Sequence, residues 1–447
     1  MKYYSTNKKA PLASLQEAVT KGLASDKGLY MPEKIKQLPD SFFEKMKDMS
    51  FQEIAYVVAD AFFGEDIEAD TLKTIVYDTL NFDTPVVHVK DNIYSLELFH
   101  GPTLAFKDVG ARFMARTLGY FIQSPPLTPP KEGNSSPLGE LEGAVNVLVA
   151  TSGDTGSAVA NGFLGVPGIR VFVLYPKGKV SPIQECQFTT LGQNITALEI
   201  DGTFDDCQAL VKAAFMDEEL NNKMQLTSAN SINVARFLPQ AFYYFYAYAQ
   251  LAKQGKADNV VFCVPSGNFG NITAGLFGKR MGLPVKRFIA ANNKNDIFLK
   301  YLQTKEYTPR PSVTTLANAM DVGDPSNFVR ILDLYDYNHD AICKDISGCR
   351  YLDEDIRSTL KKCYKETGYL LDPHGACGYQ ALIDELQPDE TGVFLETAHP
   401  AKFLETVESI IEEKVEIPQK LQAFMQGKKQ SFELTKDFEN FKAFLMP

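Results

Sequence analysis

Features that mark several other protein classes are missing from this chain of 447 residues. No segment approaches the ~18 consecutive apolar residues that a membrane helix requires, and the opening "MKYYSTNKKAPLAS" lacks the apolar core of a signal peptide. No run of Lys and Arg occurs, and the net charge is −11. Since nucleic-acid binding depends on clustered positive charge, we expect neither nucleic-acid nor membrane partners. The sequence predicts a soluble, cytoplasmic protein.

Cysteine and histidine are sparse and poorly placed for disulfides or metals. The seven cysteines include no C-x-x-C pair, and the five histidines never fall at metal-ligand spacing. Nucleotide fingerprints are missing as well. There is no G-x-G-x-x-G, and the lysine after Gly278 lacks the other residues of a phosphate-binding P-loop. We therefore expect no disulfide framework, no metal site and no nucleotide site.

The pattern of apolar segments divides the chain into three regions. Residues 1–85 are predicted to form a small, mostly helical N-terminal domain. Residues 86–403 alternate short apolar strands, such as "VNVLVA" and "NVVFCVP", with helices, which predicts an α/β fold whose parallel sheet is covered on both faces. A Pro- and Ser-rich excursion, 124–140, is expected at the surface of this region. Residues 404–447 are predicted to be a helical segment that packs on it.

Two strand-to-helix turns have an unusual composition. The first turn is "ATSGDTGSA", 150–158, and the second is "PSGNFGN", 265–271. Glycines let the backbone curl so that several N–H groups converge, and a helix N-terminus favours negative charge, so each turn suits an anion. Alternatively, the Ser, Asp and Asn side chains only cap the helices that follow. Ligands of parallel sheets bind at the carboxyl ends of strands, where both turns lie.

Besides these two turns, the sequence contains a lysine in an apolar setting whose amine could be reactive. Lys107 lies in "HGPTLAFKDVGARFMAR", directly after Phe106. One reading is a helical salt-bridge surface, because Asp108 and Arg112 stand four residues apart. The other is an amine that forms a Schiff base. A reactive lysine together with two anion-binding turns is what pyridoxal phosphate and an amino-acid substrate require.

Five motifs together resemble threonine synthase, a pyridoxal-phosphate enzyme with the fold of the tryptophan synthase β-subunit. They are "PTLAFKDVGARF", "ATSGDTGSA", "PSGNFGN", "NSINVARFLPQ" and "ETAHPAKF", and the openings "YYST" and "GLYMPE" extend the likeness to the N-terminal region. The resemblance implies two parallel-sheet α/β subdomains within residues 86–403. The 124–140 excursion is longer than the family core requires.

The resemblance also implies roles for individual residues. Lys107, beside Phe106, would hold the cofactor covalently, and Thr397 would meet its pyridine nitrogen. Since side chains alternate along a strand, Glu396 should point away from the ligand of Thr397; alternatively, Thr397 caps a helix. The cofactor phosphate would be held by Gly267, Asn268, Phe269, Gly270 and Asn271. The loop of Thr151, Ser152, Gly153, Asp154 and Thr155 would hold the substrate carboxylate.

The substrate phosphate is expected near a third group of polar residues. In "SANSINVARFLPQ", Asn230 and Ser231 precede Arg236, whose guanidinium can bind two phosphate oxygens. An interdomain ion pair is the alternative for Arg236. His399 and Lys402 could help to neutralise the phosphate, or they could be a helix-start histidine and a surface lysine.

The function implied is threonine synthase: γ-elimination of phosphate from O-phospho-L-homoserine and β-addition of water, giving L-threonine. Released Lys107 would act as the base at Cα, in a site that closes to exclude water. One alternative is a dehydratase or phospholyase of the same fold that releases 2-oxobutyrate. A second is a non-catalytic protein that binds small anions. We expect a monomer or a homodimer.

Overall fold

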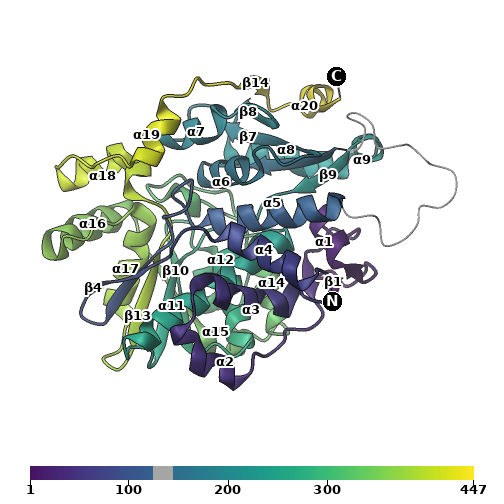
Figure 1. The fold of residues 1–447 in the computed structure, drawn as a ribbon. Coiled ribbons are helices and arrows are strands. Elements are labelled where there is room, and N and C mark those ends of the chain that lie inside the picture. Colours follow the sequence, from purple (N-terminus) through teal and green to yellow (C-terminus); the bar gives the residue numbers. More distant parts are fainter. Residues whose placement is uncertain (124–143, 447) are drawn as a thin grey trace.

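The computed structural model describes residues 1–123 and 144–446, so the predicted excursion 124–140 lies outside the described residues. Three sheets organise these residues, and Figure 1 shows the two larger ones, with α5 (Lys107–Gln123) running between them. Within the described ranges, no helix has both the length and the apolar character needed to cross a membrane.

The larger sheet has six strands in the order β12-β11-β10-β13-β5-β4. Neighbouring strands are parallel except β4 and β5, which form an antiparallel edge. β10 and β13 are buried along their whole length, as expected for a sheet covered on both faces. The strands are β4 (Val86–Lys90), β5 (Ile93–Glu97), β10 (Val260–Pro265), β11 (Val285–Asn292), β12 (Ile346–Arg350) and β13 (Thr391–Glu396).

The second sheet has five parallel strands in the order β14-β8-β7-β6-β9. The predicted α/β fold with parallel sheets is thereby confirmed. The strands are β6 (Val145–Ala150), β7 (Ile169–Pro176), β8 (Ile195–Asp201), β9 (Gln225–Ser228) and β14 (Phe432–Thr435).

Helices connect the parallel strands and cover both sheets (Figure 1). α11 carries the aromatic run "FYYFYAYAQL", and its buried Tyr243 and Tyr244 lie in the main hydrophobic core. The helices of this region are α6 (Asp154–Phe163), α7 (Pro182–Thr189), α8 (Phe204–Met216), α9 (Glu218–Lys223), α10 (Val234–Phe237), η2 (Leu238–Gln240), α11 (Ala241–Lys253), α12 (Gly270–Arg280), α13 (Ile297–Thr304), η3 (Asn318–Met320), α14 (Phe328–Leu334), α15 (His339–Asp345), α16 (Asp353–Thr367) and α17 (Pro373–Glu385).

The N-terminal residues form helices and a small antiparallel sheet of order β2-β1-β3 that the sequence pattern did not predict. Its strands are only two to four residues long, too short to show a periodic pattern. A capping box of Ser50 and Glu53 begins α3, which packs against α11. The elements are β1 (Lys2–Ser5), β2 (Ala13–Ser14), α1 (Leu15–Lys21), β3 (Tyr30–Pro32), α2 (Asp40–Lys45), η1 (Met46–Asp48), α3 (Phe51–Phe63) and α4 (Ala69–Thr79).

The C-terminal residues cross from one sheet to the other. After β13 the chain forms η4 (Pro400–Phe403), α18 (Leu404–Ile411) and α19 (Gln419–Met425), and it then adds β14 beside β8 before α20 (Phe438–Leu445). The sequence predicts only helices here. β14 is a short, mostly exposed edge strand, so it lacks the buried run that identifies a strand in a sequence.

Candidate active site

A cleft between the two sheets gathers the predicted residues at the carboxyl ends of the strands, where ligands of parallel sheets bind. It holds about 890 Å³ of space between atoms, its opening to solvent included. The predicted residues that line it are Phe106, Lys107, Ser152, Thr155, Asn230, Ser231, Arg236, Gly267, Asn268, Phe269, Gly270, Asn271 and Thr397.

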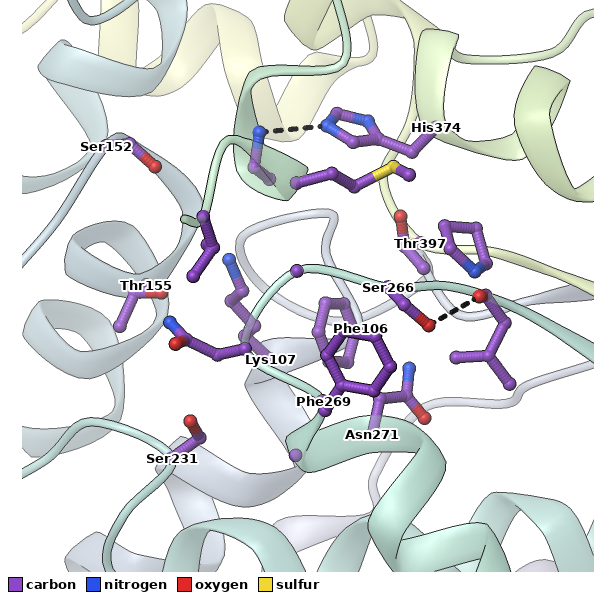
Figure 2. A pocket seen from close by; sticks show the side chains of 18 of the residues that line it. Phe106, Lys107, Ser152, Thr155, Ser231, Ser266, Phe269, Asn271, His374 and Thr397 are labelled. Carbon is purple, nitrogen blue, oxygen red and sulfur yellow. Dashed lines mark hydrogen bonds between the residues drawn. The ribbon is translucent and has the colours of Figure 1, made fainter. Parts of the chain in front are cut away.

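Lys107 is the first residue of α5, and its loop is tied to the end of β13. The Phe106 amide donates to the Thr397 carbonyl at 2.9 Å. The amine lies 5.5 Å from the centre of the Phe106 ring, and Figure 2 shows it directed toward the wall that Ser152 and Thr155 form. Shielding from water lowers the pKa of Lys107 to about 8; Asp154 opposes this effect. Such an amine is far more often neutral, and hence nucleophilic, than an exposed one.

The salt-bridge surface considered for this helix is not formed. Asp108 is buried and accepts hydrogen bonds from the backbone and hydroxyl of Thr103, at 2.9 and 2.6 Å. Arg112 instead donates to the carbonyls of Thr79 and Asp78.

The glycine-rich loop after β10 forms a tight cradle at the N-terminus of α12. Phe269 adopts a left-handed conformation, with φ of 60°. A Cβ on Gly267 would lie 2.6 Å from the Ala319 carbonyl oxygen, so a side chain is sterically excluded there. Converging amides at the start of an eleven-residue helix suit a phosphate.

Asn271 anchors this loop through its side-chain oxygen, and its side-chain nitrogen is an unpaired hydrogen-bond donor among the described residues. Its Oδ1 accepts hydrogen bonds from the hydroxyls of Tyr243 and Tyr244, both at 2.7 Å. Its buried Nδ2 has no hydrogen-bond partner among the described residues. A buried donor without a partner is costly, and an acceptor on a bound ligand would satisfy it.

The loop after β6 divides its residues between the cleft and the interior. Ser152 and Thr155 line the cleft. Thr151 and Gly153 do not line it: the Thr151 hydroxyl accepts from the amides of Gly153 and Gly156, at 2.9 and 2.7 Å, and so shapes the turn. Asp154 also turns away, because its carboxylate pairs with Lys402 at 2.6 Å. The structure thus places Thr151, Gly153 and Asp154 behind the cleft lining, and their predicted substrate contacts stay predictions.

Arg236 reaches the cleft without a counter-ion. It is 4% exposed; Nη1 donates to the Lys107 carbonyl at 3.1 Å, while the buried Nε has no partner among the described residues. Burial lowers the pKa of Arg236 to about 10, which leaves it charged at neutral pH. Arg236 makes no ion pair within the described chain, so the interdomain alternative is wrong. Beside it, Asn230 donates to the Ala150 carbonyl and Ser231 accepts from Asn327.

Thr397 and Glu396 lie on opposite sides of the end of β13. Thr397 faces the cleft, whereas Glu396 accepts from the Asp372 amide at 2.5 Å behind it. Burial, reinforced by the charge of Asp372, holds the pKa of Glu396 well above its usual range. Burial thus favours the protonated form of Glu396, and the two side chains alternate across the strand end as predicted.

His399 and Lys402, predicted near the substrate phosphate, do not line the cleft. The His399 ring caps η4 by accepting from the Ala401 amide at 3.1 Å, and burial together with the charge of His100 lowers the pKa of His399 to about 4. Lys402 is fully buried and is already neutralised by Asp154. Neither residue has a free positive charge for a phosphate.

The segment 318–322 and His374 form a wall that the sequence analysis missed. His374 Nδ1 lies 2.9 Å from the Asp372 carboxylate, and Nε2 accepts from the Ala319 amide at 3.2 Å (Figure 2). Asp372 and Pro373 are a recognisable helix start, but no local pattern indicates that this helix reaches the cleft. Pro265 and Ser266 of the predicted turn 265–271 also line the cleft. The lining residues without a predicted role are Phe204, Gln240, Val264, Ile272, Asn318, Ala319, Met320, Asp321, Val322 and His374.

The cleft fits pyridoxal phosphate on its own chemistry. It offers an amine with a lowered pKa, a glycine cradle for a phosphate, a free amide donor on Asn271, and the Thr397 hydroxyl. By contrast, no group of three or more His, Cys, Asp or Glu residues in the described chain could hold a metal ion.

Comparisons with known proteins match the whole chain. The family described as "Pyridoxal-phosphate dependent enzyme" matches residues 78–397; "Threonine synthase N terminus" matches 2–80 and "Threonine synthase, C-terminal" matches 375–445. The chain is 44% identical over 446 residues to threonine synthase of Haemophilus influenzae, covering 100% of both chains.

Two crystal structures extend this likeness to three dimensions. Threonine synthase from Escherichia coli superposes with a TM-score of 0.91 at 42% identity, covering 100% of this chain and 99% of that one. Pyridoxal-phosphate-bound threonine synthase from Brucella melitensis gives a TM-score of 0.88 at 34% identity, covering 100% and 98%.

Proposed function

The chain belongs to the threonine synthase family, which converts O-phosphohomoserine to threonine, and we propose how the residues of its cleft divide this reaction. It is a pyridoxal-phosphate-dependent lyase of threonine biosynthesis. The observation that carries the proposal is the convergence of the Lys107 amine, the 267–271 cradle and the unpaired Arg236 guanidinium on one cleft.

The cofactor site uses Lys107, Phe106, the 267–271 loop and Thr397. Lys107 binds the cofactor aldehyde as a neutral amine, and the loop holds the phosphate with its backbone amides. The Thr397 hydroxyl meets the pyridine nitrogen without placing a charge there. When bound, pyridoxal phosphate supplies an aldehyde for amines and a ring that delocalises the electrons left at carbon after proton loss.

The substrate is bound at its two anionic ends. Ser152 and Thr155 hold the carboxylate at the N-terminus of α6, and Arg236 holds the phosphate with Asn230 and Ser231. Arg236 suits this task because a buried guanidinium without a counter-ion gains most from a dianion. Supporting this division, Lys402 already has a counter-ion in Asp154, whereas Arg236 makes no ion pair among the described residues.

Lys107 has a second task once the substrate amine has replaced it. Its neutral Nζ accepts the proton from Cα and returns a proton later in the cycle. Segment 318–322 and His374 cover this side of the cleft. Limiting the entry of solvent, apart from the water that adds at Cβ, would suppress hydrolysis of intermediates to 2-oxobutyrate.

Other predicted features remain proposals of the same kind. We propose three units, 1–85, 86–403 and 404–447, a cytoplasmic location, and a monomeric or homodimeric state. Of the 2-oxobutyrate-releasing lyases of this fold, the simple dehydratase is disfavoured because Arg236 provides for a substrate phosphate, whereas the phospholyase is distinguished by measuring 2-oxobutyrate. The anion-binding protein is disfavoured because the lysine is present.

Replacing the lysine tests the proposal. Lys107→Ala should abolish the borohydride-trapped cofactor adduct and nearly all turnover while the chain stays folded. Lys279→Ala is a matched control, since it removes a partly buried lysine that pairs with Asp345 outside the cleft. Threonine, phosphate and 2-oxobutyrate should be measured separately with O-phosphohomoserine. Normal activity of Lys107→Ala, or equal loss in both variants, would refute the assignment.

A further inference from the structure

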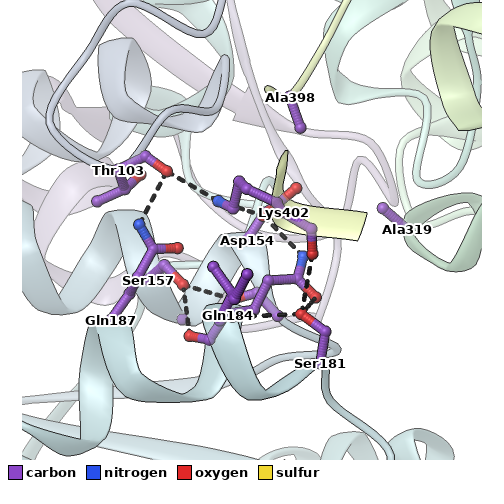
Figure 3. Close-up of polar contacts among 12 residues, drawn as sticks. Thr103, Asp154, Ser157, Ser181, Gln184, Gln187, Ala319, Ala398 and Lys402 are labelled. Carbon is purple, nitrogen blue, oxygen red and sulfur yellow. Dashed lines mark hydrogen bonds and ion pairs between the residues drawn. The ribbon is translucent and has the colours of Figure 1, made fainter. Parts of the chain in front are cut away.

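A buried polar cluster connects segments that follow strands of the two larger sheets, and Figure 3 shows its polar contacts. Lys402, fully buried on η4, contacts Asp154 at 2.6 Å and donates to the Thr103 carbonyl at 2.8 Å. Gln184 donates to Asp154 at 2.8 Å, and Ser181 contacts both Gln184 and the Lys402 carbonyl at 3.1 Å. The cluster therefore links the loop before Lys107, the start of α6, the start of α7 and η4.

A buried ion pair does not by itself stabilise a fold, because the cost of desolvating the two charges can exceed their Coulombic attraction. Well-packed apolar side chains could join the same segments. The position of the pair is informative: Asp154 stands between Ser152 and Thr155, which line the cleft, and its carboxylate is 4% exposed. A charge kept at this place acts on whatever charge develops inside the cleft.

The partners of Asp154 leave part of its carboxylate free. Lys402 and Gln184 both bind Oδ1, whereas Oδ2 accepts no hydrogen bond from the described residues. Burial would raise the pKa of Asp154, but Lys402 and Lys107 hold it at about 2, so Asp154 is an anion at neutral pH. Its second oxygen can serve another cation.

Lys107, when it is protonated, is the cation that lacks an anionic partner within the described chain. Its amine points toward the Ser152 and Thr155 wall (Figure 2). The charges that act on it are Asp154 from α6, Arg236 from α10 and Lys402 from η4, of which only the first favours an ammonium. Asp108 acts on Arg236 instead, and Asp321 and His374, which also line the cleft, are not among the charges that shift the pKa of Lys107. Asp154 is thus the carboxylate placed to balance a positive Lys107.

We propose that Asp154 is the counter-ion that stabilises the ammonium of Lys107 after Lys107 has accepted the Cα proton. This rests on the proposed function, in which Lys107 is the base. In this step the Cα–H bond breaks, its electron pair stays with the substrate, and a new N–H bond on Nζ carries the proton. Asp154 touches no reacting atom and is a positioning residue; Lys402 keeps it ionised and fixed.

Asp154→Asn tests this role because the amide oxygen can still accept from Lys402 and Gln184. Without the carboxylate, the pKa of Lys107 should fall by roughly one unit or more. Two measurements then move in opposite directions. Below the wild-type pKa, cofactor-free chain should reload pyridoxal phosphate faster, because more Lys107 is neutral. The holoenzyme should exchange the Cα proton of L-threonine for deuterium more slowly, by up to about tenfold for each unit.

Ser181→Ala is the matched control. It removes hydrogen bonds to Gln184 and to the Lys402 carbonyl without changing any charge, so the pH at which reloading is half-maximal should stay at the wild-type value. Loosening of the cluster alone would slow both reloading and exchange in Asp154→Asn, and would also shift Ser181→Ala. Either result would overturn the proposal.

A double variant keeps the test open if Asp154→Asn fails to fold with Lys402 unpaired. Asp154→Asn with Lys402→Met removes both charges. The pH of half-maximal reloading should still lie below the wild-type value, because Asp154 affects the pKa of Lys107 more than Lys402 does. An unchanged value would refute the counter-ion role while leaving Lys107 as the cofactor-binding amine. Only retained turnover in Lys107→Ala would remove that premise.

Discussion

Arg236 offers the sharpest test of how the substrate is recognised. Its guanidinium is almost fully buried, has one hydrogen bond to the Lys107 carbonyl and leaves Nε without a partner in the described chain. A charge-assisted hydrogen bond to a phosphate contributes roughly 1.5–3 kcal/mol. Arg236→Ala should therefore lower kcat/KM for O-phosphohomoserine by about ten- to a hundred-fold.

Loss of Arg236 should lower the activity without lowering the free energy of unfolding. Removing one partner of a buried ion pair strongly destabilises a protein, but Arg236 has no such partner in the described residues. Arg236→Met, which preserves much of the side-chain volume, should leave the free energy of unfolding of the ligand-free chain unchanged or higher. Arg236→Lys should rescue only part of kcat/KM, because an ammonium cannot bind two oxygens in a fork.

The assays are steady-state phosphate and threonine release, cofactor absorbance, and urea denaturation of all three variants. Cofactor affinity should match that of the wild type, since the cofactor phosphate is assigned to the 267–271 loop. Suppose instead that Arg236→Met loses the cofactor, or loses several kcal/mol of stability. Arg236 would then be structural, and the assignment of the substrate phosphate would be wrong.

Two further predictions concern the walls of the cleft. Gly267→Val should severely weaken the binding of pyridoxal phosphate, because the new Cβ would lie 2.6 Å from the Ala319 carbonyl oxygen. Equilibrium titration measures the affinity, and an unchanged value would show that the loop is only a helix cap. Glu396→Ala should cost about 1–3 kcal/mol in free energy of unfolding by leaving the Asp372 amide unsatisfied. Glu396→Gln should cost less, because it keeps an acceptor for that amide and because burial already disfavours the charged form of Glu396. A large loss in Glu396→Gln would mean that the carboxylate is charged.

Local patterns identified the parts of the cleft that follow directly on a strand or start a helix. Lys107, the 267–271 loop and Thr397 each stand at such a junction, and each lines the cleft. Parallel strands end at one edge of a sheet, so these junctions were bound to converge. The same reasoning could not find His374 or segment 318–322, which reach the cleft only through the packing of α17 against β13.

Residue type alone misled where charge was concerned. Lys402 and His399 follow Thr397 closely in the sequence and were candidates for phosphate ligands. In the structure Lys402 forms an ion pair with Asp154, and burial lowers the pKa of His399 so that it is neutral. Conversely, the sequence favoured a ligand for Arg236 but left an ion pair open, and the structure shows no ion pair of Arg236 among the described residues. Which cation is free is decided by partners far apart in the chain.

The sequence by itself indicated the α/β class with parallel strands, a lysine in an apolar setting and the glycine-rich turn 265–271. These depend on periodicity, turn chemistry and short motifs, which are properties of neighbouring residues. The tertiary structure alone decided the orientation of Asp154, its pairing with Lys402 across 248 positions of the chain, and the resulting charge balance around Lys107. Electrostatic interactions act through space, and in a buried site they depend on distance and desolvation, neither of which a linear pattern contains.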